Sequence, residues 1–206
     1  MKKILMIALL LSVTEITLAQ VIVKGYHYHP TGDFGFVFKP TFSAELGVMG
    51  SFIEGRKLRG VVTGTYVKLK PRLNEIPITG VRSDGTGDHI LPGTQSFKKY
   101  NIAQLLLGFD YAFIRKEKFF VYGGFDLTVG RANVVYTEYV QTYMESSYDG
   151  GGVLGGCRFR LGAEYLLNPY FSLLINAQRG GWLLTDPAAI NFANDYGLGV
   201  KYNLNL

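Results

Sequence analysis

The sequence predicts an all-β chain, an eight-stranded antiparallel up-and-down barrel, and three observations indicate this fold class. Apolar and polar residues alternate with period two in short runs along most of the chain. Glycine (26), tyrosine (14) and phenylalanine (14) are abundant, as expected for strands and tight turns. The third observation is that the chain ends inside such a run, NDYGLGVKYNLNL, on apolar Leu206. A barrel accounts for this ending, because the last strand pairs with the first.

Residues 1–19 have the layout of a signal peptide, which leaves residues 20–206 as one exported domain. Lys2 and Lys3 precede an apolar run over 4–13, and Thr17-Leu18-Ala19 offers a small-residue cleavage site. The run is too short for a spanning helix, which needs about twenty apolar residues.

Charge and cysteine content exclude several classes of function. The formal charge of +5 falls to +4 on removal of Lys2, Lys3 and Glu15, and no basic run marks a nucleic-acid partner. Cys157 is the single cysteine, which excludes an internal disulfide framework and a cysteine-rich metal site. No cofactor is predicted.

The first four strands are expected at residues 21–29, 34–49, 58–70 and 97–113. Pro30-Thr31-Gly32-Asp33 forms a turn after the first, and a charged turn near residue 54 separates the second from the third. Residues 71–96 are polar and rich in glycine and proline, so we expect a long loop there.

The last four strands are expected at 119–132, 154–167, 171–177 and 194–206. Short turns near residues 116 and 168 alternate with long loops at 133–152 and 182–189. An even strand count puts both chain ends on one side, with the short turns.

The alternation does not show which face of each strand lies inside the barrel. The placement of charges decides between two kinds of barrel, a soluble one and a membrane one. A soluble, lipocalin-like barrel has its apolar face inside, whereas a membrane barrel has it outside. The apolar rows carry charges at strand ends alone (Lys68, Lys70, Lys99 and Arg131). The polar rows mix charges of both signs with small residues, which suits a narrow lumen. We therefore predict a transmembrane barrel with a lumen ion network: Lys39, Glu45, Arg59, Asp110, Asp126, Arg158, Arg160, Glu164, Asp195 and Lys201.

With its signal peptide, strand order and terminal strand (Gly199, Tyr202, Leu204, Leu206), the chain resembles the small porin-like outer-membrane β-barrel family, of the OmpX and OmpA-barrel type. Leu206 replaces the final Phe usual in that family. The resemblance implies a Gram-negative outer-membrane location and insertion by the barrel-assembly machinery. Family members are mostly structural, adhesive or weakly permeable, and some related barrels modify lipids.

Other candidate sites have simpler interpretations. His27 and His29 share a strand face but lack a third metal ligand, and SDGTGD (83–88) lacks the closing Glu of a calcium loop. No histidine has a catalytic Ser and acid partner. Four loop tyrosines suit either partner binding or an aromatic girdle with strand extension: Tyr136, Tyr139, Tyr143 and Tyr148.

We therefore expect a non-enzymatic barrel with a largely closed lumen and a structural or surface-interaction role. Its expected partners are outer-membrane lipid and an extracellular or membrane protein bound through 71–96 and 133–152. The alternatives are a small pore and, third, a lipid-modifying enzyme.

Overall fold

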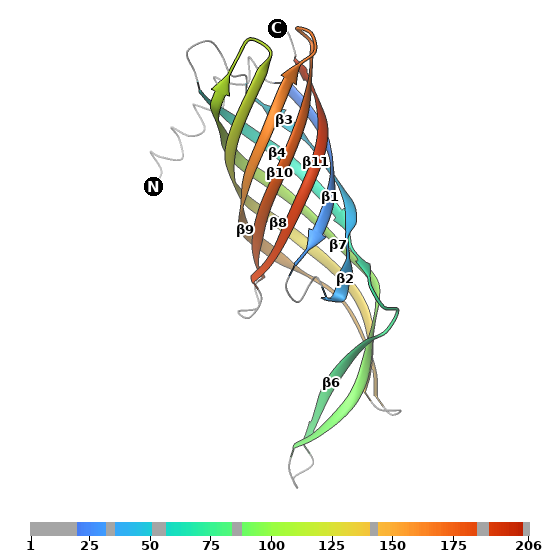
Figure 1. Cartoon of the computed structure of the whole chain (residues 1–206). Helices are drawn as coiled ribbons and strands as arrows, with labels where there is room; N and C mark the ends of the chain where they lie inside the picture. The colour runs from blue at the N-terminus through green and yellow to red at the C-terminus, as the bar shows by residue number, and fades with distance from the viewer. Residues whose placement is uncertain are drawn as a thin grey trace, which may run out of the picture.

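The chain forms a closed, tilted ring of strands from which a narrower sheet extends (Figure 1). This computed structural model describes residues 20–31, 36–50, 57–83, 88–140, 144–184 and 190–203. The predicted signal peptide, residues 1–19, lies outside them. Within the described residues, no helix has both the length and the apolarity needed to cross a membrane.

Eight strands make the ring, and all neighbours are antiparallel: β1 (Gln20–Pro30), β3 (Thr41–Met49), β4 (Leu58–Lys68), β7 (Asp88–Arg115), β8 (Phe119–Val140), β9 (Met144–Leu166), β10 (Phe171–Leu184) and β11 (Ile190–Asn203). Consecutive ring strands pair, and β1 also pairs with β11, so the predicted pairing of the last strand with the first is confirmed. Because the ring is closed, its strands have no free edge within the barrel wall.

In the middle of the barrel wall, the large apolar side chains point outward and the charged side chains point inward. Leu198, Phe159 and Leu127 are 68%, 62% and 61% exposed, whereas Arg59 and Asp110 are 1% and 0% exposed. An apolar exterior around a charged interior is the arrangement of a membrane barrel, because lipid replaces water outside. The predicted transmembrane fold is confirmed.

Two predicted strands are shorter than expected. The strand predicted at 34–49 divides at Pro40 into β2 (Phe38–Lys39) and β3, since proline has no N–H to donate to a ladder. The strand predicted at 58–70 divides into β4 and β5 (Lys70–Pro71), and β5 pairs with β2 in a small separate sheet.

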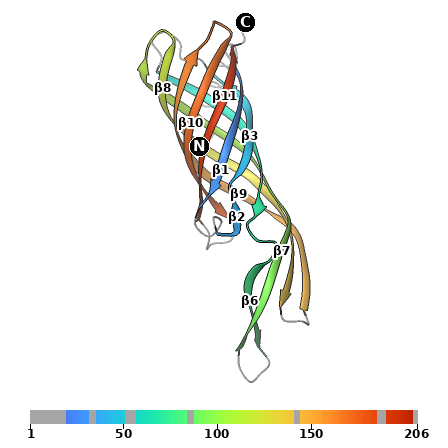
Figure 2. The same cartoon turned by 45° about the vertical axis from the view of Figure 1, so that its right-hand side comes forward.

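The expectation of long loops at 71–96 and 133–152 was wrong, because most of both segments is paired strand. β6 (Ile76–Ser83) forms a hairpin with the first half of β7, and β8 pairs with β9 as far as Val140 and Met144. These strands continue past the ring as a twisted extension (Figures 1 and 2). The first part of the third predicted loop, residues 182–184, belongs to β10, which runs to Leu184, and residues 185–189 lie outside the described residues.

The two ends of the barrel differ, and the short turns gather at one of them as the strand order predicted. β1 begins and β11 ends at one end, together with the short turns at 116–118 and 167–170. The extension leaves the opposite end. In outer-membrane barrels the short turns face the periplasm, so we expect the extension on the extracellular side.

We predict that Leu161→Arg lowers the free energy of unfolding in lipid vesicles by about 2–4 kcal/mol, because it places a charge in the apolar belt. Leu161 is 57% exposed on the outer face of β9. Tyr170→Arg, at a site 50% exposed in the turn before β10, is the control and should cost about 0–1 kcal/mol. Denaturant titration measures both, and equal costs would contradict the assignment of the outer face to lipid.

Candidate functional site

The barrel interior holds a group of buried charges built mainly on β7, β8 and β9. Asp110 on β7 lies opposite Gly124 on β8, which lies opposite Arg160 on β9. In the next inward row, Gly108 lies opposite Asp126, which lies opposite Arg158. Each row therefore holds one aspartate, one arginine and one glycine on three neighbouring strands.

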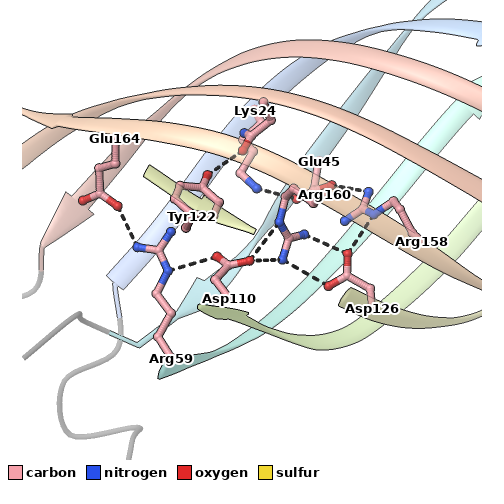
Figure 3. Close-up of polar contacts among 10 residues, drawn as sticks. Lys24, Glu45, Arg59, Asp110, Tyr122, Asp126, Arg158, Arg160 and Glu164 are labelled. Carbon is pink, nitrogen blue, oxygen red and sulfur yellow. Dashed lines mark hydrogen bonds and ion pairs between the residues drawn. The ribbon is translucent and has the colours of Figure 1, made fainter. Parts of the chain in front are cut away.

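Arg160 is the centre of the network (Figure 3). Its Nε donates to Asp110 Oδ1 at 3.0 Å and its Nη2 to the same oxygen at 2.6 Å. Its Nη1 donates to Asp126 Oδ2 at 2.7 Å. One guanidinium thus joins two carboxylates that would otherwise repel each other, and its planar fork suits this geometry.

Arg158 continues the network to the opposite wall of the barrel. Its Nε donates to Asp126 Oδ2 at 2.8 Å and its Nη1 to Glu45 Oε2 on β3 at 2.9 Å. Lys24 on β1 donates to the other oxygen of Glu45, also at 2.9 Å. These bonds cross the lumen from β9 to β1, as Figure 3 shows.

Arg59 extends the network toward the end that carries the short turns. Its Nε donates to Asp110 Oδ2 at 3.0 Å and its Nη1 to Glu164 Oε2 at 2.6 Å. The guanidinium carbon lies 4.6 Å from the Tyr122 ring centroid, a cation–π contact. Lys201 on β11 pairs with the other oxygen of Glu164.

Glycine makes room for these side chains. A Cβ at Gly124 would overlap Asp110 Oδ1, and a Cβ at Gly108 would overlap Asp126 Oδ1. By contrast, outward-facing Gly60 and Gly155 have no atom within 4 Å of a Cβ. The lumen glycines are therefore a steric requirement of the network.

The structure brings together eight of the ten residues predicted for the lumen network: Glu45, Arg59, Asp110, Asp126, Arg158, Arg160, Glu164 and Lys201. Asp195 lies in the lumen but accepts a bond from Gln178 Nε2 at 3.1 Å and makes no ion pair with another described residue. Lys39 is exposed on β2, outside the ring, so its placement in the lumen was wrong. The division at Pro40 explains this error, because the predicted strand carried the inward row of β3 past the true strand end.

Lys24 is the network residue that sequence reasoning missed. It is 2% exposed on the inward row of β1, together with Ile22, Tyr26 and Tyr28. The outward row of β1 holds Val21, Val23 and Gly25 followed by His27 and His29. Both rows mix apolar and polar residues, so alternation gave no clear inward face there.

Two apolar clusters share the lumen with the charges. The smaller one consists of Ile22, Met49, Val61 and Leu174, in which Ile22 lies opposite Lys201 and Leu174 opposite Glu164. Toward the extension lies a larger cluster: Tyr28, Phe38, Val67, Leu69, Tyr100, Ile102, Ala132, Leu154 and Ala193. Phe38 from β2 belongs to this second cluster, so the small β2–β5 sheet places a ring over the barrel mouth.

A small cavity of about 30 Å³ with a mixed polar and apolar lining lies between the network and the outer apolar cluster. Gln104, Thr128 and Asp195 are among its lining residues, and each has a buried polar atom without a partner among the described residues. A cavity of this size holds about two water molecules.

Three of the four loop tyrosines, Tyr136, Tyr139 and Tyr148, are part of the extension. Tyr136 on β8 stacks on Tyr148 on β9 at 5.0 Å between ring centroids, and Phe97 on β7 lies 5.5 Å from Tyr136. Tyr139 is exposed, and its Oη contacts Glu145 Oε1 at 3.5 Å. Tyr143 lies outside the described residues.

The described residues contain no cluster of three potential metal ligands. His27 and His29 lie 4.2 Å apart between ring centroids, edge to face, on the outer side of β1 beside Phe42 and Tyr196. Most of the SDGTGD segment, residues 84–87, lies outside the described residues.

No protein-family model matches the chain, and no curated protein matches its sequence. Solved structures do match its fold. Neisserial surface protein A is 14% identical with a TM-score of 0.57, covering 90% of this chain and 97% of its own. Two others have lower scores. A major outer membrane protein from Thermus thermophilus has 13% identity, coverage of 90% and 99%, and a TM-score of 0.49. Ail of Yersinia pestis is 12% identical, covers 90% of this chain and 97% of its own, and has a TM-score of 0.47. At such identity the first match shows the fold alone: this chain has the same β-barrel fold as Neisserial surface protein A.

Proposed function

We propose that this protein is a non-enzymatic barrel of a Gram-negative outer membrane that displays its extended sheet for interaction at the cell surface. The extension carries this proposal, because three ring strands continue beyond the barrel and a fourth strand, β6, joins them there. An apolar exterior around a charged lumen, together with the predicted signal peptide, supports the location.

The extension offers a surface suited to a protein partner. Phe97, Tyr136 and Tyr148 form a row of rings across three neighbouring strands. Tyr148 is 47% exposed, so part of this row is open to solvent. Aromatic rings give large contact area at low entropy cost, which is why tyrosine is frequent in binding surfaces.

The filled lumen supports a role that does not depend on permeation. Eight strands leave an interior that side chains can fill, and here ion pairs and two apolar clusters occupy it. A small pore is the second candidate, and the cavity of about 30 Å³ inside the lumen is the observation that favours it. A lipid-modifying enzyme, the third, finds no support in the described residues.

We predict no steady channel openings when the wild-type protein is inserted into planar bilayers, because the network and both apolar clusters block the lumen. Folded insertion is checked in parallel by heat-modifiable gel mobility, so that a silent bilayer is not mistaken for a missing protein. Steady single-channel currents from the folded wild type would favour the pore.

Removing the central arginine should destabilise the barrel strongly. We predict that Arg160→Gln lowers the free energy of unfolding by about 3–5 kcal/mol, because Asp110 and Asp126 then lose a shared buried cation. The matched control is Arg131→Gln, which removes an exposed arginine on β8 and should change stability by about 0.5 kcal/mol or less. Urea titration in phosphatidylcholine vesicles measures both. Similar small effects would show that the network contributes little.

A photoreactive amino acid at Tyr148 should capture a protein partner on intact cells, because that ring lies on the extension. The control position is Tyr165, which is 48% exposed at the periplasmic end of β9 and should label lipid. Protein adducts from both positions, or from neither, would contradict a surface-interaction role for the extension.

A further inference from the structure

Five cations gather on the outer side of the barrel wall where the extension begins. Lys39 lies opposite Lys70 in the pairing of β2 with β5. Lys68 pairs with Asn101, and Leu69 N–H donates to Tyr100 O at 2.8 Å. Continued by one residue, this register would set Lys70 opposite Lys99, beside a β-bulge between Phe97 and Lys99. Three lysines thus lie side by side across neighbouring strands. Lys68 and Arg131 flank them, and we call these five residues the basic patch.

Within the described residues, no carboxylate pairs with the positive charges of the basic patch. All five side chains are exposed, and none makes an ion pair with another residue in the described part of the chain. Along the row that contains Lys99, the next carboxylate is Asp149, two strands away and so about 10 Å distant. Like charges directly opposite each other destabilise a sheet unless an anion lies between them. The arrangement therefore suits a polyanionic ligand.

The position of the basic patch relative to the apolar belt indicates which kind of anion it binds. Tyr66 and Val129, 51% and 50% exposed, precede Lys68 and Arg131 by two residues on the same outer rows. The basic patch thus borders the apolar belt, on the side of the extension. Phosphate headgroups of a membrane lie at this border, whereas a soluble partner approaching from above first meets the extension.

We propose that the basic patch binds the phosphates of lipid A in the outer leaflet. Lysine ammonium groups act as point donors to phosphate oxygens, and the Arg131 guanidinium adds a bidentate donor. This inference goes beyond the proposed surface role, because it concerns the barrel wall and not the extension. A bound phosphate would also relieve the repulsion among Lys39, Lys70 and Lys99.

The test compares two triple variants in zwitterionic detergent. Lys39→Gln, Lys70→Gln and Lys99→Gln together remove the central row of the patch. The control combines Lys57→Gln, Lys116→Gln and Lys118→Gln, three exposed lysines at the opposite end. Native mass spectrometry measures the binding of diphosphorylated lipid A and of the same lipid without its phosphates. Heat-modifiable gel mobility verifies that each variant is folded.

Each lysine near an anionic surface contributes about fivefold in affinity, so the patch variant should bind diphosphorylated lipid A on the order of a hundredfold more weakly than wild type. The control variant should bind as wild type does, and phosphate-free lipid should bind weakly to all three. Salt should reduce wild-type binding, because the patch is exposed.

Three results would overturn the proposal. One is equal affinity of wild type and patch variant for diphosphorylated lipid A, and another is equal binding of the phosphate-free lipid by wild type. The third is tighter binding of heparin than of lipid A, lost in the patch variant, which would assign the patch to a soluble polyanion. None of these results depends on whether the extension binds a protein, so the two proposals fail independently.

Discussion

Closure of the ring is the constraint on which the rest of the structure depends. The β1–β11 and β4–β7 pairings turn one antiparallel meander into a wall without an edge, so backbone groups in the wall bond to one another. Closure also divides every strand into an enclosed row and an outer row. The apolar outer row then requires lipid, and the enclosed row must neutralise its own charges.

The ion network follows from that enclosure. A buried arginine without a carboxylate, or the reverse, would cost several kcal/mol, so acids and bases must be placed in register. The strands meet this condition by setting Asp110 and Asp126 on adjacent inward rows facing Arg160 and Arg158, with glycine in the remaining positions. The same side chains fill the lumen, which is why stability and closure of the lumen arise from one set of contacts.

The barrel and its extension share strands but face different surroundings. β7, β8 and β9 carry lipid-facing residues near the short turns and solvent-exposed tyrosines such as Tyr139 and Tyr148 at their far ends. Between these two regions lies the basic patch, at the edge of the apolar belt. Along these strands the outer side chains therefore change from apolar to cationic and then to exposed aromatic residues.

The sequence alone determined the fold class, the transmembrane orientation of the faces and most of the lumen network, because period-two alternation and charge clearance are properties of single strands. Tertiary structure decided the rest. Lys24 belongs to the network because β1 pairs with β3, which sets Lys24 opposite Glu45. Lys39 lies outside the lumen because the ladder of β3 ends at Pro40 and β2 pairs with β5 instead. The local sequence of 71–96 and 133–152 also did not predict strands there. Polar, glycine-rich segments form strands when a long neighbouring strand such as β7 or β8 supplies the hydrogen bonds.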